Sequence, residues 1–154
     1  MTTVTNPSTA DVFAMAMAME QTSTDFYQGL SECAGRRPVR EFCEEAAVEE
    51  ARHLQILGGL SQKLALEQPT ASPEAAEALH GLAKRMIQPD PAIVRNVVDG
   101  GDLRAALAMA IQMEECSVFF YSQLVELFPT QADTLQTLVE QEEHHLEVFR
   151  SLSV

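Results

Sequence analysis

Apolar residues between positions 8 and 35 recur at the three- and four-residue spacing that places side chains on one face of a helix. Ser8 or Thr9 is a suitable N-cap, and Gly35 marks the point by which the helix must end. The pattern therefore predicts one long amphipathic helix. Its inner side is expected to carry Val12, Phe13, Ala16, Met19, Phe26 and Leu30.

A second long helix is predicted from about Pro38, which suits a first helical turn, to about Leu66. The segment 67–101 that follows is too long for an ordinary turn between helices of a bundle, so it must cross the bundle. Within it, the residues after Pro73 and the residues 91–98 each have the pattern of a short helix.

The third and fourth long helices are separated by a single proline-containing turn. Asp102 is the expected N-cap of the third helix, which ends at Phe128 because Pro129 disfavours helical geometry in the residue before it. Thr130 or Asp133 is expected to begin the fourth helix, which continues nearly to the end of the chain. The prediction is an all-α four-helix bundle, made of two helical hairpins joined by a long crossover.

Length and hydrophobic content fit a single domain over residues 1–154, since 46% hydrophobic residues can bury one core. No apolar run reaches the roughly 20 residues needed to span a bilayer. The first residues lack the basic and apolar segments of a signal peptide. The three cysteines form no C-x-x-C pair, which is typical of reduced thiols. We therefore expect a cytoplasmic protein with no membrane partner.

Acidic residues outnumber basic ones by 23 to 10, for a formal net charge of −13. A nucleic-acid partner requires a basic surface that neutralises phosphates, so that class of function is excluded. Most of the acids are expected to lie on solvated helix surfaces. Acids on a side that faces the bundle core need another reason, because unpaired carboxylates are rarely buried.

Two E-x-x-H motifs supply such a reason: Glu50 with His53, and Glu142 with His145. Residues three apart lie on one face of a helix, so each motif can present an oxygen and a nitrogen to the same ion. One such motif is weak evidence, because helices are rich in Glu. A second copy in the matching hairpin makes a metal site the favoured interpretation.

A duplicated pattern on the first and third helices completes the set. Glu20 is followed seven residues later by Tyr27, and Glu114 by Tyr121, in segments that match when the chain is shifted by 94 residues. In an antiparallel hairpin both Glu residues reach the level of the E-x-x-H motifs, at about 1.5 Å of rise per residue. The tyrosines follow almost two turns later on the inner face, where their phenols can donate to ligand carboxylates from outside the ligand set.

Other residues of the same types are expected to have ordinary roles. His144 lies one position off the inward face, so it is expected either to be exposed or to contact the ligands from outside the ligand set. His80 lies in the crossover and is expected at the surface. The matched methionine pairs are expected to fill the core, and Cys43 is expected to be a small buried hydrophobic residue. The methionines concerned are Met15, Met19, Met109 and Met113.

With these motifs in place, the chain resembles the ferritin-like superfamily and is most similar to its rubrerythrin branch. The resemblance covers about residues 8–152, and Glu20, Glu50, His53, Glu114, Glu142 and His145 occupy the family's ligand positions. It implies a ferritin-like bundle and two bound iron ions, with manganese as the alternative metal, which suits a mixed oxygen and nitrogen ligand set. It also implies that Glu20 is a terminal ligand and that Glu50, with Glu114 or Glu142, provides the bridging carboxylates.

The resemblance implies a di-iron oxidoreductase that reacts with hydrogen peroxide, O2 or both at a centre of four Glu and two His, and a role in oxidative stress. Rubrerythrins reduce peroxide at such a centre, whereas ferritins and bacterioferritins oxidise ferrous iron. Two alternatives stay open. One is an iron-handling protein of the ferroxidase type, for storage or detoxification. The other is a non-enzymatic interaction module that metal stabilises.

Three departures from the related families shape these expectations. Ser117 stands where peroxide-reducing rubrerythrins carry an additional Glu, which puts efficient peroxidase activity in doubt. The two C-x-x-C pairs of a rubredoxin domain are absent, so electrons are expected from an external donor such as a rubredoxin-type protein. Ala51 replaces the haem-binding Met of bacterioferritins, so no haem is expected.

We expect a homodimer.

Overall fold

The computed structural model describes residues 8–33, 35, 37–69, 73–74, 77–78, 81 and 91–152. All of their regular elements are helical, which confirms the all-α prediction. The helices are α1 (Thr9–Cys33), α2 (Arg37–Glu67), α4 (Pro91–Asp99), α5 (Leu103–Leu127) and α6 (Ala132–Ser151), with a 3₁₀ turn, η1 (Pro129–Gln131), before α6.

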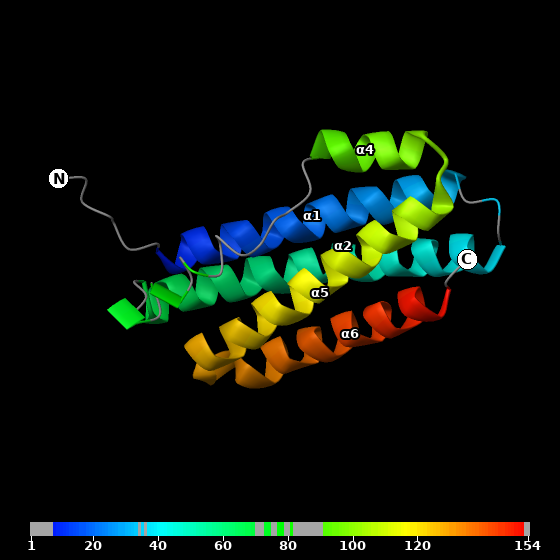
Figure 1. Ribbon diagram of the computed structural model, residues 1–154. Coiled ribbons are helices and arrows are strands. Elements are labelled where there is room, and N and C mark those ends of the chain that lie inside the picture. The colour runs from blue at the N-terminus through cyan, green and yellow to red at the C-terminus, as the bar shows by residue number, and fades with distance from the viewer. Residues whose placement is uncertain are drawn as a thin grey trace.

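The long helices form two hairpins that lie side by side (Figure 1). Helix α1 packs mainly on α2, and α5 packs mainly on α6. The start of α1 is tied to the end of α2, because the backbone N–H of Thr9 donates to the carbonyl of Pro69 at 3.3 Å. Helix α4 lies along the outside of α1 and leads into α5 (Figure 1). This arrangement is the pair of hairpins that the helical pattern predicts.

The predicted starts of α1 and α5 are confirmed by their caps. At the start of α1, Ser8 and Asp11 exchange hydrogen bonds, with the N–H of Asp11 donating to Ser8 Oγ at 3.1 Å and the N–H of Ser8 donating to Asp11 Oδ2 at 3.0 Å. At the start of α5, Asp102 accepts from the N–H of Ala105 at 3.1 Å. Gly101 precedes this cap with a φ of +67°, a conformation that favours glycine.

The start of α6 differs from the prediction. The helix begins at Ala132 and has no side-chain cap, rather than beginning at Thr130 or Asp133. The 3₁₀ turn runs directly into the helix, and its backbone bonds satisfy the first N–H groups, including that of Gln131, which donates to Phe128 at 3.0 Å. A capping side chain is therefore not needed. The short helix expected after Pro73 lies largely outside the described residues, whereas the one expected at 91–98 is α4.

Buried apolar residues form two clusters, one toward each end of the bundle. On α1, Met19 belongs to one cluster and Phe26 to the other; on α6, Val139 and Phe149 are divided in the same way. The predicted metal ligands of both helices, Glu20 on α1 and Glu142 and His145 on α6, fall between these positions. The core therefore holds a polar level between two apolar ends.

The remaining core predictions are confirmed with one exception. Cys43 is fully buried, and burial raises the pKa of its thiol to about 12. Met19 and Met113 are buried as expected, but Met15 is 39% exposed, so it does not fill the core. Its repeat partner Met109 is partly buried and packs against the core.

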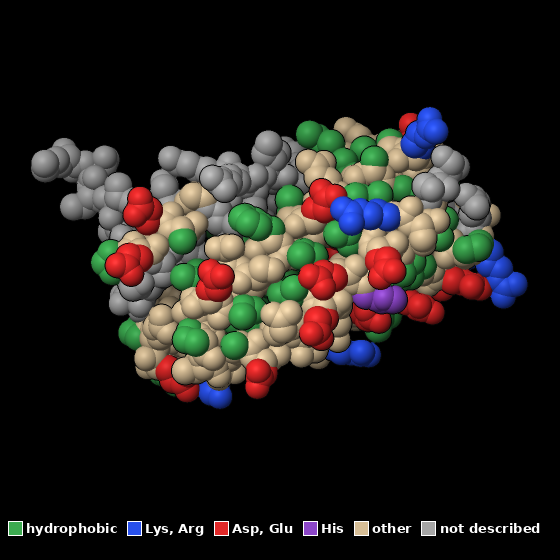
Figure 2. Space-filling model, turned by 60° about the horizontal axis from the view of Figure 1, so that its bottom comes forward, with side chains coloured by type: hydrophobic (Ala, Val, Ile, Leu, Met, Phe, Trp, Pro, Cys, Tyr) green, Lys and Arg blue, Asp and Glu red, His purple; other side chains and the backbone are tan. Residues whose placement is uncertain are grey.

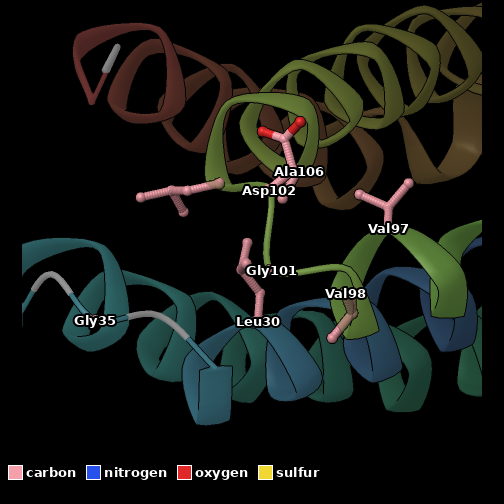
Figure 3. Close-up of a pocket in the computed structure, with 8 residues that line it drawn as sticks. Leu30, Gly35, Val97, Val98, Gly101, Asp102 and Ala106 are labelled. Carbon is pink, nitrogen blue, oxygen red and sulfur yellow. The ribbon is translucent and has the colours of Figure 1, made fainter.

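A small pocket of about 60 Å³ lies where the end of α1, α4 and the start of α5 meet (Figure 3). A Cβ at Gly29 would come within 3.2 Å of Val98, so the glycine lets α4 approach α1 closely. The pocket contains none of the predicted site residues. Its lining includes the apolar side chains of Leu30, Val97, Val98 and Ala106, together with Asp102.

Acidic side chains are spread over the face of the bundle shown in Figure 2. They do not gather into one acidic patch on this face, which fits the prediction of solvated helix surfaces. None of the described helices combines the length and the hydropathy required to cross a bilayer.

Candidate metal centre

The predicted acids and histidines meet at the polar level of the core. They form two groups whose potential ligand atoms lie within 4.8 Å of one another. One group contains Glu20 and His53, the other contains Glu114 and His145, and both contain Glu50 and Glu142. All six side chains are buried to 1% exposure or less. Four helices thus contribute to one cluster, as the duplicated motifs predict.

Glu50 and Glu142 lie in the middle of the cluster, and each spans the two imidazoles. The Oε2 and Oε1 atoms of Glu50 lie 3.1 Å from Nδ1 of His53 and 3.2 Å from Nδ1 of His145. The corresponding distances from Oε1 and Oε2 of Glu142 are 3.1 and 3.3 Å. The planes of the two imidazole rings are inclined to each other by 27°, with centroids 6.2 Å apart. Each central carboxylate therefore offers one oxygen to each side.

Glu20 and Glu114 lie at the two ends of the cluster. Oε1 of Glu20 is 3.6 Å from Nδ1 of His53, and Oε1 of Glu114 is 3.6 Å from Nδ1 of His145. The second oxygen of each carboxylate, Oε2, is buried and has no hydrogen-bond partner. Two buried carboxylate oxygens without partners are costly in a folded protein unless a cation or a proton satisfies them.

Both tyrosines donate to these terminal carboxylates, as predicted, but each does so across the bundle. Tyr27 of α1 donates to Glu114 of α5 at 2.5 Å, and Tyr121 of α5 donates to Glu20 of α1. Burial, followed by the neighbouring carboxylates, raises the pKa of both phenols well above the ordinary value. The phenols therefore remain protonated donors, and each one orients a carboxylate of the other hairpin.

Two further residues contact the cluster from outside, and the sequence analysis missed both. Nε2 of His145 lies 2.6 Å from Oε2 of Glu49, and Nε2 of His53 lies 2.7 Å from Oε1 of Gln141. Each partner immediately precedes the Glu of an E-x-x-H motif, and the two match at the same shift of 92 residues as the motifs. This matched position was the signal in the sequence that could have identified them.

The protonation of the cluster follows from its burial and its crowded carboxylates. Burial, followed by the other carboxylates, raises the pKa of Glu50 and Glu142 well above the ordinary value. Burial alone would lower the pKa of His53 and His145, but hydrogen bonds to three carboxylates each outweigh it and raise the pKa. Burial opposes the charge of Glu20 too, yet hydrogen bonds from Glu50 and His53 hold its pKa at about 2. Without metal, the cluster therefore holds protons.

Two histidines and one serine were expected to lie outside the ligand set. His144 is exposed, as expected, and His80 lies outside the described residues. Ser117 is buried at 4% exposure on α5, one turn after Glu114. Ser23, at the matching position one turn after Glu20, is buried as well at 5%. The two hairpins therefore carry the same short side chain at the position where an extra Glu would reach the cluster.

These residues fit a pair of divalent cations. The partnerless Oε2 atoms of Glu20 and Glu114 lie one at each end, and the central carboxylates offer oxygens to both sides. Four carboxylates supply four negative charges, which two divalent ions would neutralise in a site with almost no access to water. Oxygen and imidazole ligands suit iron or manganese better than metals that prefer thiolates.

The two-hairpin helical bundle with this buried carboxylate and histidine cluster defines a protein of the ferritin-like class. Residues 11–153 match the family model described as Rubrerythrin, and the chain therefore belongs to the rubrerythrin family. The match covers α1, α2, α4, α5 and α6. No curated protein matches the chain significantly, and no solved structure does.

Proposed function

We propose that the cluster is a dinuclear iron centre whose bridging ligands are Glu50 and Glu142. Glu20 and His53 then complete one iron subsite, and Glu114 and His145 complete the other. The observation that carries this assignment is the position of the two central carboxylates, each with one oxygen 3.1–3.3 Å from each Nδ1. Of the two partners for Glu50 that the family resemblance left open, we choose Glu142 rather than Glu114, because Glu114 lies near only one of the imidazoles, that of His145.

The proposed reaction is the two-electron reduction of hydrogen peroxide, with O2 as a second oxidant. A pair of ferrous ions would supply both electrons at once, and two protons complete the conversion of one peroxide to two waters. The chain's own residues create the setting for this chemistry. Tyr27 and Tyr121 hold the terminal carboxylates, and the apolar clusters on either side exclude bulk water. Electrons for further cycles come from an external donor, such as a rubredoxin-type protein.

Turnover is proposed to be slow without a dedicated reductase. The short side chains of Ser23 and Ser117 leave the two subsites with matching Glu and His ligands. Neither subsite then has a spare carboxylate that can take the place of its histidine when the charge of the ion changes. The proposed centre is thus more symmetrical than that of a peroxide-reducing rubrerythrin, in which the additional Glu serves this purpose.

The experiment that tests the function has two stages. Chelator-stripped protein is loaded anaerobically with Fe(II), and bound iron is measured per chain after gel filtration. The loaded protein is then mixed in a stopped-flow instrument with one equivalent of peroxide or with O2. Two bound irons that are both oxidised by one peroxide support the proposal. Loading of one ion or none would refute the dinuclear centre, and two irons that resist both oxidants would leave metal as a stabiliser of an interaction module.

Iron handling by a ferroxidase reaction is the second candidate, because the same ligands could oxidise ferrous iron as substrate. The two are distinguished by supplying Fe(II) in large excess under air. An enzyme of the proposed kind oxidises its resident pair and stops, whereas an iron-storage protein continues and retains the ferric product. Sizing chromatography adds a second criterion, since storage requires a cage-sized particle and the proposed oxidoreductase is a homodimer.

A further inference from the structure

Both cluster histidines extend a hydrogen bond away from the cluster through Nε2. His145, on α6, reaches Glu49 of α2 at 2.6 Å, and His53, on α2, reaches Gln141 of α6 at 2.7 Å. The two hairpins are therefore linked by two reciprocal hydrogen bonds. In each, the residue before an E-x-x-H glutamate orients the imidazole of the opposite hairpin. Both histidines are 1% exposed, whereas Glu49 and Gln141 reach the surface.

These contacts select one tautomer of each imidazole. A carboxylate oxygen of Glu49 and the amide oxygen of Gln141 accept hydrogen bonds, so Nε2 carries the proton in both rings. Once Nδ1 gives up the proton that it holds in the metal-free protein, its lone pair is directed into the cluster, 3.1–3.6 Å from three carboxylates in each case. Glu49 and Gln141 thus prepare His53 and His145 to bind a cation through Nδ1.

The two subsites are otherwise closely matched in charged and polar groups. Each has one terminal Glu, one tyrosine donor and a share of Glu50 and Glu142. Phe42 packs with its edge against His145, but it brings no charge. The two subsites therefore differ in charge at one place, the acceptor of the outer hydrogen bond. His145 has the negatively charged carboxylate of Glu49, whereas His53 has the neutral amide of Gln141.

A carboxylate and an amide act differently on a metal-binding imidazole. A hydrogen bond to an ionised acceptor is stronger than one to a neutral acceptor, and it makes the imidazole a more basic ligand. The negative charge of Glu49 also adds attraction for a cation on its own side. Water screens part of this effect, because the Glu49 side chain is 41% exposed.

We infer that Glu49 and Gln141 are positioning residues that make the two subsites unequal, so that a divalent cation fills the subsite of Glu114 and His145 before that of Glu20 and His53. This inference rests on the proposed dinuclear centre and deepens it. Loss of such an outer partner typically weakens metal binding by about 10–100-fold, and with the exposure of Glu49 the preference is expected near the lower end, at about tenfold.

The test uses Co(II) as the probe and the full chain, stripped of metal. Wild type and the variants Glu49→Gln, Gln141→Glu and the double swap Glu49→Gln/Gln141→Glu are crystallised with one equivalent of Co(II) per chain. Anomalous diffraction at the cobalt edge then measures the occupancy of each subsite. Titration of the Co(II) absorption bands measures the two affinities in solution. Glu45→Gln, an exposed acid one turn earlier on α2, removes the same charge and serves as the matched control.

In wild type, cobalt is expected mainly at the subsite of Glu114 and His145. Glu49→Gln should bring the two occupancies close to equal, the double swap should reverse the preference, and Glu45→Gln should leave it unchanged. Equal filling in wild type, a swap that fails to move the cobalt, or a control as effective as Glu49→Gln would overturn the inference while the dinuclear centre stands. Cobalt at neither subsite would overturn the proposed function itself.

Discussion

Replacing Tyr27 by Phe removes a single hydroxyl from the centre and leaves the ring in place. Tyr27 is fully buried, and its hydroxyl donates to Oε1 of Glu114 at 2.5 Å. The other oxygen of Glu114 has no hydrogen-bond partner, so in the metal-free protein the variant leaves the carboxylate with only the imidazole of His145, 3.6 Å from Oε1. The ring keeps its packing against Phe149, with centroids 5.1 Å apart. The change in stability of the variant therefore measures the contribution of the Tyr27 hydroxyl.

The expected cost follows from the burial of the carboxylate. A hydrogen bond to a charged buried group contributes about 1.5–3 kcal/mol, and the Glu114 carboxylate is 1% exposed, so water cannot replace the lost donor. For a chain of 154 residues, 1 kcal/mol shifts the melting temperature by roughly 2–4 °C. The metal-free Tyr27→Phe protein should melt about 3–12 °C below wild type.

The assay is urea unfolding and thermal melting of chelator-treated protein, with the absence of metal verified by elemental analysis. A second background, Glu114→Gln, separates the hydrogen bond from any change in packing. The hydroxyl should matter less there, because the carboxylate that it satisfies is gone. If Tyr27→Phe costs less than about 0.5 kcal/mol, or costs as much in the Glu114→Gln background, the hydroxyl does not stabilise the terminal carboxylate and the reasoning is refuted.

Three further predictions concern the metal and its chemistry. Crystals of the iron-loaded protein should show two ions about 3–4 Å apart, and loading should be abolished by His145→Ala but preserved by His144→Ala; equal loss in both variants would contradict the register of α6. The melting temperature of the metal-free protein should fall as the pH is raised from about 5 to 9, whereas that of the loaded protein should fall much less. The reason is that Glu50, Glu142 and the two histidines bind protons more tightly in the folded protein than in the unfolded chain. This stabilisation is complete when the pH is below the ordinary pKa values, 4.5 for Glu and 6.5 for His, and it is lost as the pH rises toward and through the raised pKa values of the folded state. A flat profile for the metal-free protein would show that folding takes up no protons at the cluster. Finally, Ser117→Glu should increase the steady-state rate of peroxide reduction with a rubredoxin-type donor. Rapid peroxide reduction by the unmodified protein would contradict the idea that the missing carboxylate limits turnover.

The sequence by itself determined which residues form the cluster. A three-residue spacing puts Glu50 and His53 on one helix face whatever the rest of the fold does, and Glu142 and His145 repeat that geometry. Short turns then bring Glu20 and Glu114 to the same level, because rise per residue is constant along a helix. Local periodicity and loop length therefore suffice to gather all six side chains, and both can be read without coordinates.

Only the tertiary structure decided how those side chains are paired. Tyr27 donates to Glu114 rather than to Glu20 on its own helix, and Glu49 holds His145 at a separation of 96 residues along the chain. The position of Glu50 and Glu142 between the two imidazoles has the same origin. These contacts depend on the rotation of each hairpin about its axis and on its offset along its neighbour, and both follow from the packing of the whole core. Residue spacing within one helix carries no information about this rotation or this offset. The contacts between residues of opposite hairpins could therefore be identified only from the tertiary structure.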